Sequence, residues 1–186
     1  MELNLVTRNK NKAEEFKHYL EPDITINHID IEYREIRAET NETVAKEAAR
    51  ELANQLKKPV VVEDSGFFMD AYDGFPGVYT KTVFTKLGCR GLLKLLQGVE
   101  NRTVKYKSVI AYCEPGDIPH LFAGEEEGTM AEEERGTLGW GEDSLFIPKE
   151  NNPEQKTYGE MRQPGENLFR GRAIKRLREY LLSRNP

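Results

Sequence analysis

The stretch Pro59-Val-Val-Val-Glu-Asp-Ser-Gly-Phe-Phe-Met-Asp-Ala-Tyr-Asp-Gly-Phe-Pro-Gly-Val-Tyr79 organises the rest of the chain. Its β-branched run, Val60–Val62, predicts a strand that is buried on both faces. We expect this strand to end at two adjacent carboxylates, Glu63 and Asp64. Open α/β sheets place ligands at the carboxyl ends of their strands, and Mg²⁺ is usually held by one or two carboxylates plus substrate phosphates. The alternative is a buried strand that simply ends in a polar loop.

Length and charge bound the class of protein. The chain of 186 residues is long enough for one well-buried core. Its formal net charge of -5 and pI near 5.4 argue against a general binder of nucleic acids or anionic membranes. The two cysteines, Cys89 and Cys113, have no metal-ligand spacing and indicate reduced thiols in a cytoplasmic protein. We find no signal-peptide pattern and no long apolar run, so we expect no membrane span.

Hydrophobic periodicity predicts strands and helices that follow one another in a single α/β domain, residues 1–186, with two lobes. The predicted strands cover residues 2–7, 24–31, 60–62, 103–113, 120–128, 128–130 and 144–147. The predicted helices cover residues 13–20, 41–57, 79–87, 91–97 and 168–183. We expect residues 131–143 and the polar segment 151–166 to be irregular.

The turn from Thr7 to Lys12, between the first strand and the first helix, is a candidate anion site. Either Thr7 or Asn9 can cap the helix, whose free amide groups and dipole attract a phosphate. Lys12 adds a positive charge. The alternative is a capped surface helix with solvated lysines. The sequence has no P-loop, so a phosphate site here is of another kind.

Two further residues allow two interpretations each. Glu35 follows the second predicted strand and is either a third carboxylate for a metal or a surface glutamate. Trp140, the only tryptophan, lies among glycines. Its ring is either open to a flat ligand or an anchor in the core beneath a loop.

Five ordered motifs resemble those of the Ham1 family, the inosine/xanthosine triphosphate pyrophosphatases. They are Thr7-x-Asn9-x-x-Lys12, Val62-Glu-Asp-Ser-Gly66, Gly74-Phe-Pro-Gly-x-Tyr79, Gly141-x-Asp143-x-x-Phe146 and Thr157-Tyr-Gly-Glu-Met161. The resemblance therefore runs from the first strand to at least Met161. It implies an elongated, two-lobed α/β fold with a central mixed sheet flanked by helices.

The resemblance also implies a function. It is the attack of water on the α-phosphorus of a non-canonical purine nucleotide (ITP, dITP or XTP), giving the monophosphate and pyrophosphate. The family uses Mg²⁺, with Mn²⁺ as the alternative, and is commonly a homodimer. No nucleic acid and no membrane is expected as a partner. The nucleotide would lie between the two lobes.

Residue roles follow from the resemblance, position by position. Asp64 would orient or deprotonate the water. The implied metal ligands are Glu35, Glu63 and Asp64; the implied phosphate ligands are Thr7, Asn9, Lys12 and Ser65; the implied base contacts are Trp140, Gly141, Asp143, Phe146 and Arg170.

The chain departs from the family at the base. The family usually has a lysine and then Ser-His-Arg at the start of the last helix, which read the 6-keto group. Here Leu168 and Phe169 replace serine and histidine, only Arg170 remains, and the lysine position falls near Pro164. Glu142 stands where an aromatic residue is usual. A site that loses hydrogen-bond donors should lose discrimination.

Other arginines could supply the missing donors. Arg162, Arg170 and Arg172 are candidates, and each is otherwise a solvated arginine.

Three hypotheses remain on the sequence alone. The first is a pyrophosphatase for ITP, dITP and XTP. The second is a pyrophosphatase that the altered last helix has redirected to another modified nucleotide. The third is a nucleotide-binding protein without catalysis, which the retained carboxylates and Lys12 disfavour.

Overall fold

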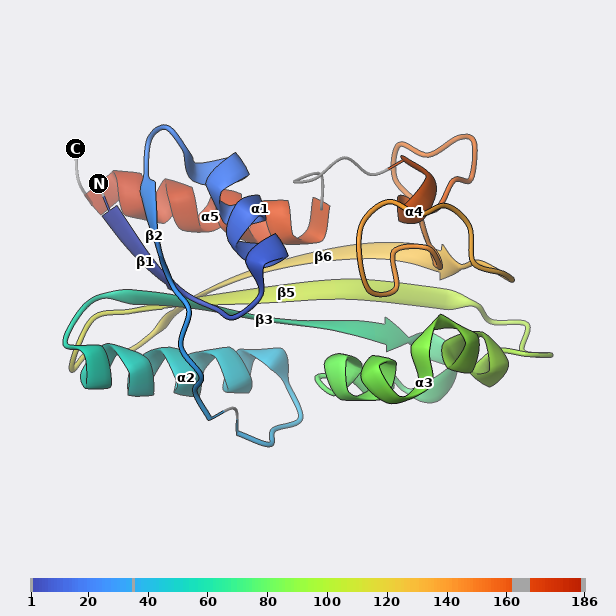
Figure 1. The fold of residues 1–186 in the computed structure, drawn as a ribbon, viewed down its shortest axis with the longest axis horizontal. Helices are drawn as coiled ribbons and strands as arrows, with labels where there is room; N and C mark the ends of the chain where they lie inside the picture. Colours follow the sequence, from blue (N-terminus) through green and yellow to red (C-terminus); the bar gives the residue numbers. More distant parts are fainter. Residues whose placement is uncertain (1, 35, 162–167, 185–186) are drawn as a thin grey trace.

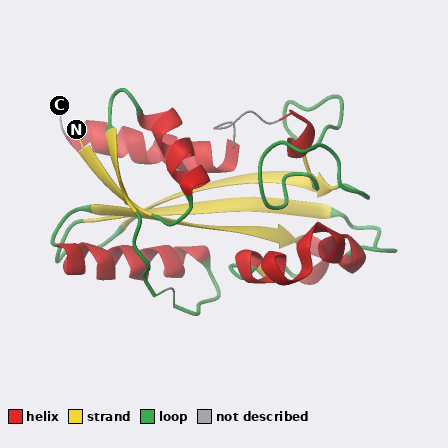
Figure 2. Ribbon diagram, in the orientation of Figure 1, coloured by secondary structure: helices red, strands yellow, loops and turns green. Residues whose placement is uncertain are grey.

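The computed structural model describes residues 2–34, 36–161 and 168–184. It is an elongated α/β structure in which helices cover a central sheet (Figure 1). The sheet has seven strands in the order β2-β1-β3-β5-β6-β7, and β4 pairs with β3. Figure 2 shows the strands in yellow between the helices in red. Because β1 is parallel to β2 and β3 while the other pairs are antiparallel, the predicted mixed sheet is confirmed.

The strands are β1 Glu2–Val6, β2 Thr25–Ile29, β3 Val60–Met69, β4 Pro76–Gly77, β5 Thr103–Cys113, β6 His120–Met130 and β7 Phe146–Pro148. The helices are α1 Lys10–Leu20, α2 Asn41–Leu56, α3 Thr80–Leu95, α4 Tyr158–Met161 and α5 Leu168–Arg184, with a 3₁₀ turn at Asp70–Tyr72. None of these helices is long and apolar enough to cross a bilayer.

Alternation along β3 gives its two faces to different helices. Val61 packs with α1 and α5 on one face, whereas Val60 and Val62 pack with the alanine-rich side of α2 on the other. Successive side chains of a strand point to opposite faces, so a strand covered on both sides is apolar at every position. The predicted burial of Val60–Val62 on both faces is confirmed.

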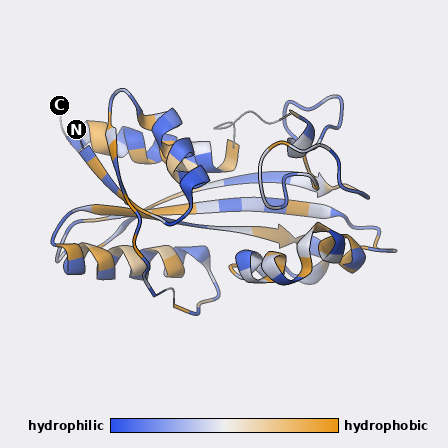
Figure 3. Cartoon of the chain, in the orientation of Figure 1, coloured by the Kyte–Doolittle hydropathy of each residue, from blue (hydrophilic) through white to orange (hydrophobic). Residues whose placement is uncertain are grey.

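A third cluster fills the far end of the sheet. It joins Phe67 and Met69 of β3 to Leu92 of α3 and Phe146 of β7. Figure 3 shows that the long strands are more hydrophobic where α1, α2 and α5 cover them than in their middle sections. The polar middle of the strands is where the site lies.

The structure corrects the predicted end of the central strand. β3 does not end at Glu63 and Asp64 but runs on to Met69. Its partner β5 is long enough to pair with every residue from Val60 to Met69, so the backbone of the polar segment is satisfied within the sheet. The two carboxylates therefore lie inside a strand.

Two smaller predictions were wrong as well. The short strand expected at 128–130 is the end of β6, and a short helix, α4, lies in the polar segment expected to be irregular. The two helices expected at 79–87 and 91–97 are the two parts of α3, which bends at Gly88 with φ of 60°.

Gly124 of β6 allows α5 to lie directly on the sheet. A Cβ at this position would be 2.0 Å from the carbonyl oxygen of Phe169 and 2.8 Å from the amide nitrogen of Ala173. Both contacts are with helix backbone, which cannot move without moving α5. The close approach fixes the height of α5 above β6.

We predict that Gly124→Ala lowers the free energy of unfolding by about 1–3 kcal/mol, because the methyl group overpacks the interface with α5. Chemical denaturation measures the change. Glu125→Ala, an exposed neighbour on the same strand, is the control and should change stability by less than about 1 kcal/mol. Equal stability of wild type and Gly124→Ala would show that α5 is free to shift.

Candidate active site

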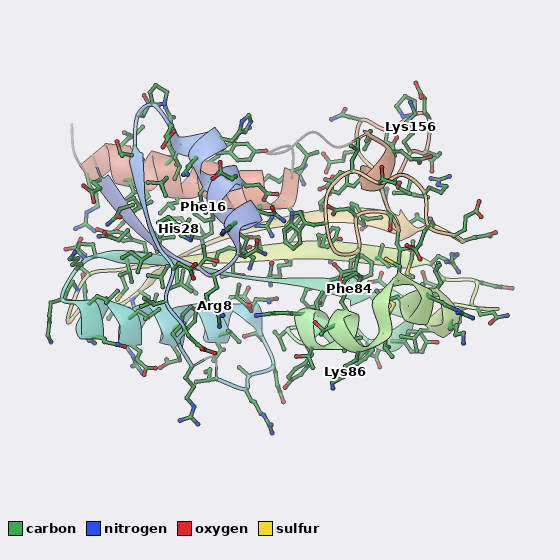
Figure 4. The ribbon with its side chains drawn as sticks, viewed as in Figure 1. Arg8, Phe16, His28, Phe84, Lys86 and Lys156 are labelled. Carbon is green, nitrogen blue, oxygen red and sulfur yellow. The ribbon has the colours of Figure 1, made fainter. Side chains whose placement is uncertain are left out.

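A cleft of about 940 Å³ opens where β1 leaves β3. These strands pair at Leu5 and Val61, and β4 covers the same side of β3 again at Phe67 and Phe68. The edge of β3 in between forms one wall. The cleft is lined by residues 7–12, 32–33, 63–66, 78, 80–82, 84–85, 106, 140–143 and 169–170. Figure 4 labels two of them, Arg8 after β1 and Phe84 on α3.

The N-terminus of α1 forms one end of the cleft. Asn9 caps the helix, because its side-chain oxygen accepts from the amides of Asn11 at 3.0 Å and Lys12 at 3.2 Å. Thr7 Oγ1 in turn accepts from the Asn9 amide at 3.1 Å. The first turn of α1 has no acidic residue, so its positive end is not neutralised locally. Arg8, Lys10, Lys12 and Lys81 add positive side chains to the lining.

A buried charge cluster lies under this end. Glu63 Oε1 accepts from Arg170 Nε at 3.0 Å and from Ser108 Oγ at 2.6 Å, and Glu63 Oε2 lies 2.5 Å from Lys12 Nζ. Arg170 also pairs with Glu15 through Nη1. Two acids and two bases thus balance one another, and they tie α1, β3 and α5 together.

Ion pairing holds the Glu63 carboxylate in its charged form. Burial alone would raise its pKa, but Arg170 and Lys12 outweigh that effect and lower the pKa of Glu63 to about 2. The same pairs raise the pKa of Arg170 further above its usual range. Because the folded pKa of Glu63 is depressed, its contribution to stability is present above about pH 4.5 and is lost as the pH falls through 2.

Asp64 faces the opposite side of the sheet from Glu63. Its Oδ2 accepts from Asn41 Nδ2 at 2.7 Å, and Asn41 is the first residue of α2. Asn41 is buried, and its other side-chain atom, Oδ1, has no hydrogen-bond partner among the residues that the structure describes. Asn41 therefore orients Asp64.

The carboxylates fit a metal ion in part. Across residues 2–34, 36–161 and 168–184, no group of three His, Cys, Asp or Glu side chains is close enough to hold a metal. Glu35 lies outside the described residues. Glu63 is engaged by two cations, so Asp64 is the described carboxylate suited to a hard cation that takes its remaining ligands from phosphate and water.

Aromatic rings form the other end of the cleft. Tyr106 of β5 stacks on Phe169 of α5, with ring centroids 4.7 Å apart and an angle of 10° between the planes. Trp140 lies against the Arg170 guanidinium, 5.5 Å from ring centroid to carbon. Phe146 is fully buried behind Tyr106 and does not line the cleft. These rings offer flat faces for a nucleobase.

The loop at residues 140–143 carries two acids with different environments. Asp143 shapes the loop, because its Oδ2 accepts from the Trp140 amide at 2.8 Å and its carbonyl from the Gly159 amide at 2.8 Å. Glu142 is buried in the cleft wall. Burial, with the neighbouring Asp143 charge, raises the pKa of Glu142 to about 7, against the smaller opposing effects of a backbone hydrogen bond and the Tyr106 hydroxyl.

The sequence from residue 3 to residue 180 matches the model of the Ham1 family. The chain belongs to the Ham1 family. The resemblance expected from the motifs is thereby confirmed. A protein named dITP/XTP pyrophosphatase from Thermococcus kodakarensis is 41% identical to this Ham1 protein over 184 residues, which are 97% of each chain. One of the same name from Methanopyrus kandleri is 40% identical over 97% of this chain and 96% of its own length.

Solved structures agree with the fold. The Ham1 protein of Staphylococcus aureus superimposes with a TM-score of 0.84 at 25% identity, over the whole of both chains. The Ham1 protein of Coxiella burnetii gives 0.83 at 26% identity, over 98% of this chain and 99% of its own. The mixed sheet with flanking helices is therefore the fold of this family.

Most of the predicted site residues line this one cleft of the Ham1 chain. They are Thr7, Asn9, Lys12, Glu63, Asp64, Ser65, Trp140, Gly141, Asp143 and Arg170. Ser65 accepts from Arg170 Nη2 at 3.3 Å. Of the arginines proposed as substitutes, Arg172 bonds to Glu125 and Glu150 away from the cleft, and Arg162 lies outside the described residues, as does Pro164.

Sequence reasoning missed several residues of the Ham1 site. They include Glu15 of α1, Asn41 of α2 and Tyr106 of β5. Lys81 follows the turn Gly74-Phe-Pro-Gly77, and that position was the one signal that could have placed it at the cleft. The others depend on contacts between segments far apart in sequence.

We predict that Arg170→Met lowers the free energy of unfolding by about 3–5 kcal/mol, because it leaves Glu15 and Glu63 buried with too little positive charge. Denaturant titration at pH 7 measures the loss. Arg176→Met, an exposed change on the same helix, serves as control and should cost less than about 1 kcal/mol. A similar cost for both variants would mean that the buried cluster does not stabilise the fold.

Glu142 makes stability depend on pH in the opposite sense to Glu63. Its folded pKa of about 7 lies above the ordinary 4.5, so the wild type loses stability as the pH rises from about 4.5 to 7. We predict that Glu142→Gln gains about 3 kcal/mol relative to wild type between pH 4.5 and pH 8.5, measured by denaturation at both pH values. Glu133→Gln, an exposed acid nearby, should show no such shift. A pH-independent difference would contradict the burial of the charge.

Proposed function

We propose that this chain is a nucleoside triphosphate pyrophosphatase that acts on dITP, ITP and XTP and releases the monophosphate and pyrophosphate. The observation that carries the proposal is one cleft with two unlike ends. A capped helix N-terminus and basic side chains suit a triphosphate, and a set of aromatic rings suits a base. The names of the relatives at about 40% identity support the same substrates.

The phosphate end explains how a triphosphate would be held. The amides at the start of α1 donate to phosphate oxygens, and the helix dipole favours their negative charge. Lys12 is held in place by Glu63, so its charge is oriented before substrate arrives. Such preorganised charges stabilise the charge that develops on phosphoryl oxygens in the transition state.

Asp64 would orient the attacking water and accept its proton. Its carboxylate lines the cleft and is fixed by Asn41, which makes Asn41 a positioning residue. A general base within hydrogen-bond reach of a water contributes about 10²–10⁴-fold to a rate. The reaction forms a bond from the water oxygen to the α-phosphorus and breaks the bond to the bridging oxygen, which leaves with pyrophosphate.

Mg²⁺, or Mn²⁺ in its place, would be held by Asp64 together with Glu35 and the phosphates. When bound it offsets negative charge on the phosphoryl oxygens. Glu63 could join the ligands only by giving up an ion pair to Lys12 or Arg170. In the described arrangement Glu63 orients those cations.

The proposal includes one domain with two lobes and a homodimer in the cytoplasm. The separate apolar clusters at the two ends of the sheet support two lobes around the cleft. Phe75, Tyr79 and Leu87 are exposed large apolar side chains near β4 and α3, which favour an interface between copies. Both cysteines are unpaired, in keeping with a reducing compartment.

A second candidate function is pyrophosphatase activity on a different modified nucleotide. Phe169 packs on Tyr106 and cannot donate a hydrogen bond to a keto group, and Glu142 brings a carboxyl group to the base end. Rates compared across bases separate the two candidates.

The test is to incubate the protein with Mg²⁺ and dITP, ITP, XTP, ATP, GTP or dUTP and to resolve pyrophosphate from orthophosphate. We expect pyrophosphate and monophosphate, fastest from the first three nucleotides. Asp64→Asn should keep dITP affinity within a few-fold and lower kcat by about 10²-fold or more. Asp117→Asn, an exposed change on a distant turn, is the control.

Orthophosphate as the product would overturn the proposed reaction. Pyrophosphate released fastest from another nucleotide would favour the second candidate. An undiminished rate in Asp64→Asn would remove Asp64 from its role. Nucleotide binding without turnover of any substrate would support a non-catalytic protein.

A further inference from the structure

Glu142 brings more hydrogen-bond acceptor capacity to the base end than the protein itself uses. An ionised carboxylate has two oxygens and about four acceptor sites. Within the described part of the chain, the Tyr106 hydroxyl is the side-chain donor near it, and that hydroxyl also lies 3.5 Å from Asp143 Oδ1. One hydroxyl proton cannot serve both acids fully, so Glu142 can accept from a ligand in the cleft.

The raised pKa of Glu142 agrees with this reading. Burial is its main cause, and the hydrogen bonds that would favour the anion are too weak to cancel it. The site would therefore gain from an N–H donor that a ligand brings to the carboxyl group. A base with no such donor leaves the buried carboxyl poorly satisfied.

Trp140 supplies the complementary group. Its indole Nε1 is buried and has no hydrogen-bond partner in the part of the chain that the structure describes. The ring lines the same cleft as Glu142 and belongs to the same turn, which Asp143 holds through the Trp140 amide. An unused donor and an acceptor with spare capacity thus lie on one short loop.

We propose that Glu142 and Trp140 select the base, Glu142 by accepting from N1–H of a 6-oxopurine and Trp140 Nε1 by donating to its 6-keto oxygen. This inference rests on the proposed pyrophosphatase function and deepens it. Trp140 Nε1 takes the place of the donors that Leu168 and Phe169 do not provide, and Glu142 adds an acceptor. In this chain the base is therefore selected by the loop at 140–143, whereas the family usually selects it with residues at the start of the last helix.

The donor and acceptor order decides which bases fit. Hypoxanthine and xanthine present a keto acceptor beside an N1–H donor, which matches the pair. Adenine presents the reverse, an amino donor beside a bare N1, so with ionised Glu142 it places donor against donor and acceptor against acceptor. Mismatched buried polar groups give large rejection ratios. Guanine shares the lactam edge, so this pair separates 6-oxo from 6-amino purines and does not separate hypoxanthine from guanine.

The test compares kcat/KM for ITP, ATP and N1-methyl-ITP, in which a methyl group replaces the N1 hydrogen. We expect wild type to prefer ITP to N1-methyl-ITP by about 10- to 100-fold. Glu142→Leu should lose most of that preference, mainly by turning over ITP more slowly. Glu133→Gln, an exposed acid outside the cleft, should keep the wild-type preference.

The outcome that overturns the proposal is an unchanged N1-methyl penalty in Glu142→Leu. If Glu142→Leu does not fold, the variant Trp140→Phe tests the proposal instead. It keeps the ring but removes the donor, and it should lower the ITP to ATP preference by about tenfold or more. An unchanged preference in Trp140→Phe would also overturn the proposal. Release of pyrophosphate from ITP by the wild type tests the proposed pyrophosphatase activity separately, because that release does not depend on the selectivity between bases.

Discussion

The site depends on the buried ion pair between Arg170 and Glu63. These residues come from α5 and β3, and each is almost wholly inaccessible to solvent. Two charges without water are stable only with several well-placed partners, which Lys12, Glu15 and Ser108 supply. The pair thereby fixes where α1 begins relative to β3. The position of the start of α1 relative to β3 therefore determines the geometry of the phosphate end of the cleft.

The alternation of the pleated strand separates two tasks. Glu63 faces α1 and α5, where it orients cations, whereas Asp64 faces α2, where Asn41 holds it beside the cleft. Adjacent carboxylates had suggested a shared metal. Their opposite directions and different partners instead suggest separate roles. Glu63 would orient the cations that bind phosphate, and Asp64 would orient the attacking water.

Much of the fold followed from local patterns. β-branched runs and 3.6-residue periodicity located most elements to within a few residues. The family resemblance named ten residues that line one cleft. The extent of β3 did not follow, because a polar segment can remain a strand when a long partner such as β5 pairs with it. Glu15, Asn41 and Tyr106 could not be assigned either. Their roles come from contacts with residues distant in the chain, which a single sequence does not encode locally.

The length of β3, β5 and β6 has a mechanical consequence. All three strands run without interruption past the cleft, from the end covered by α2 to the end covered by α3 and α4 (Figure 1). A hinge between the two ends would have to break two long antiparallel ladders at once, so the sheet behaves as a stiff beam. The start of α1 is fixed to β3 by the buried ion pairs. A change in the width of the cleft would then come from the other parts of its lining, α3 and the loop at 140–143. The base-reading loop would move independently of the sheet that carries Asp64.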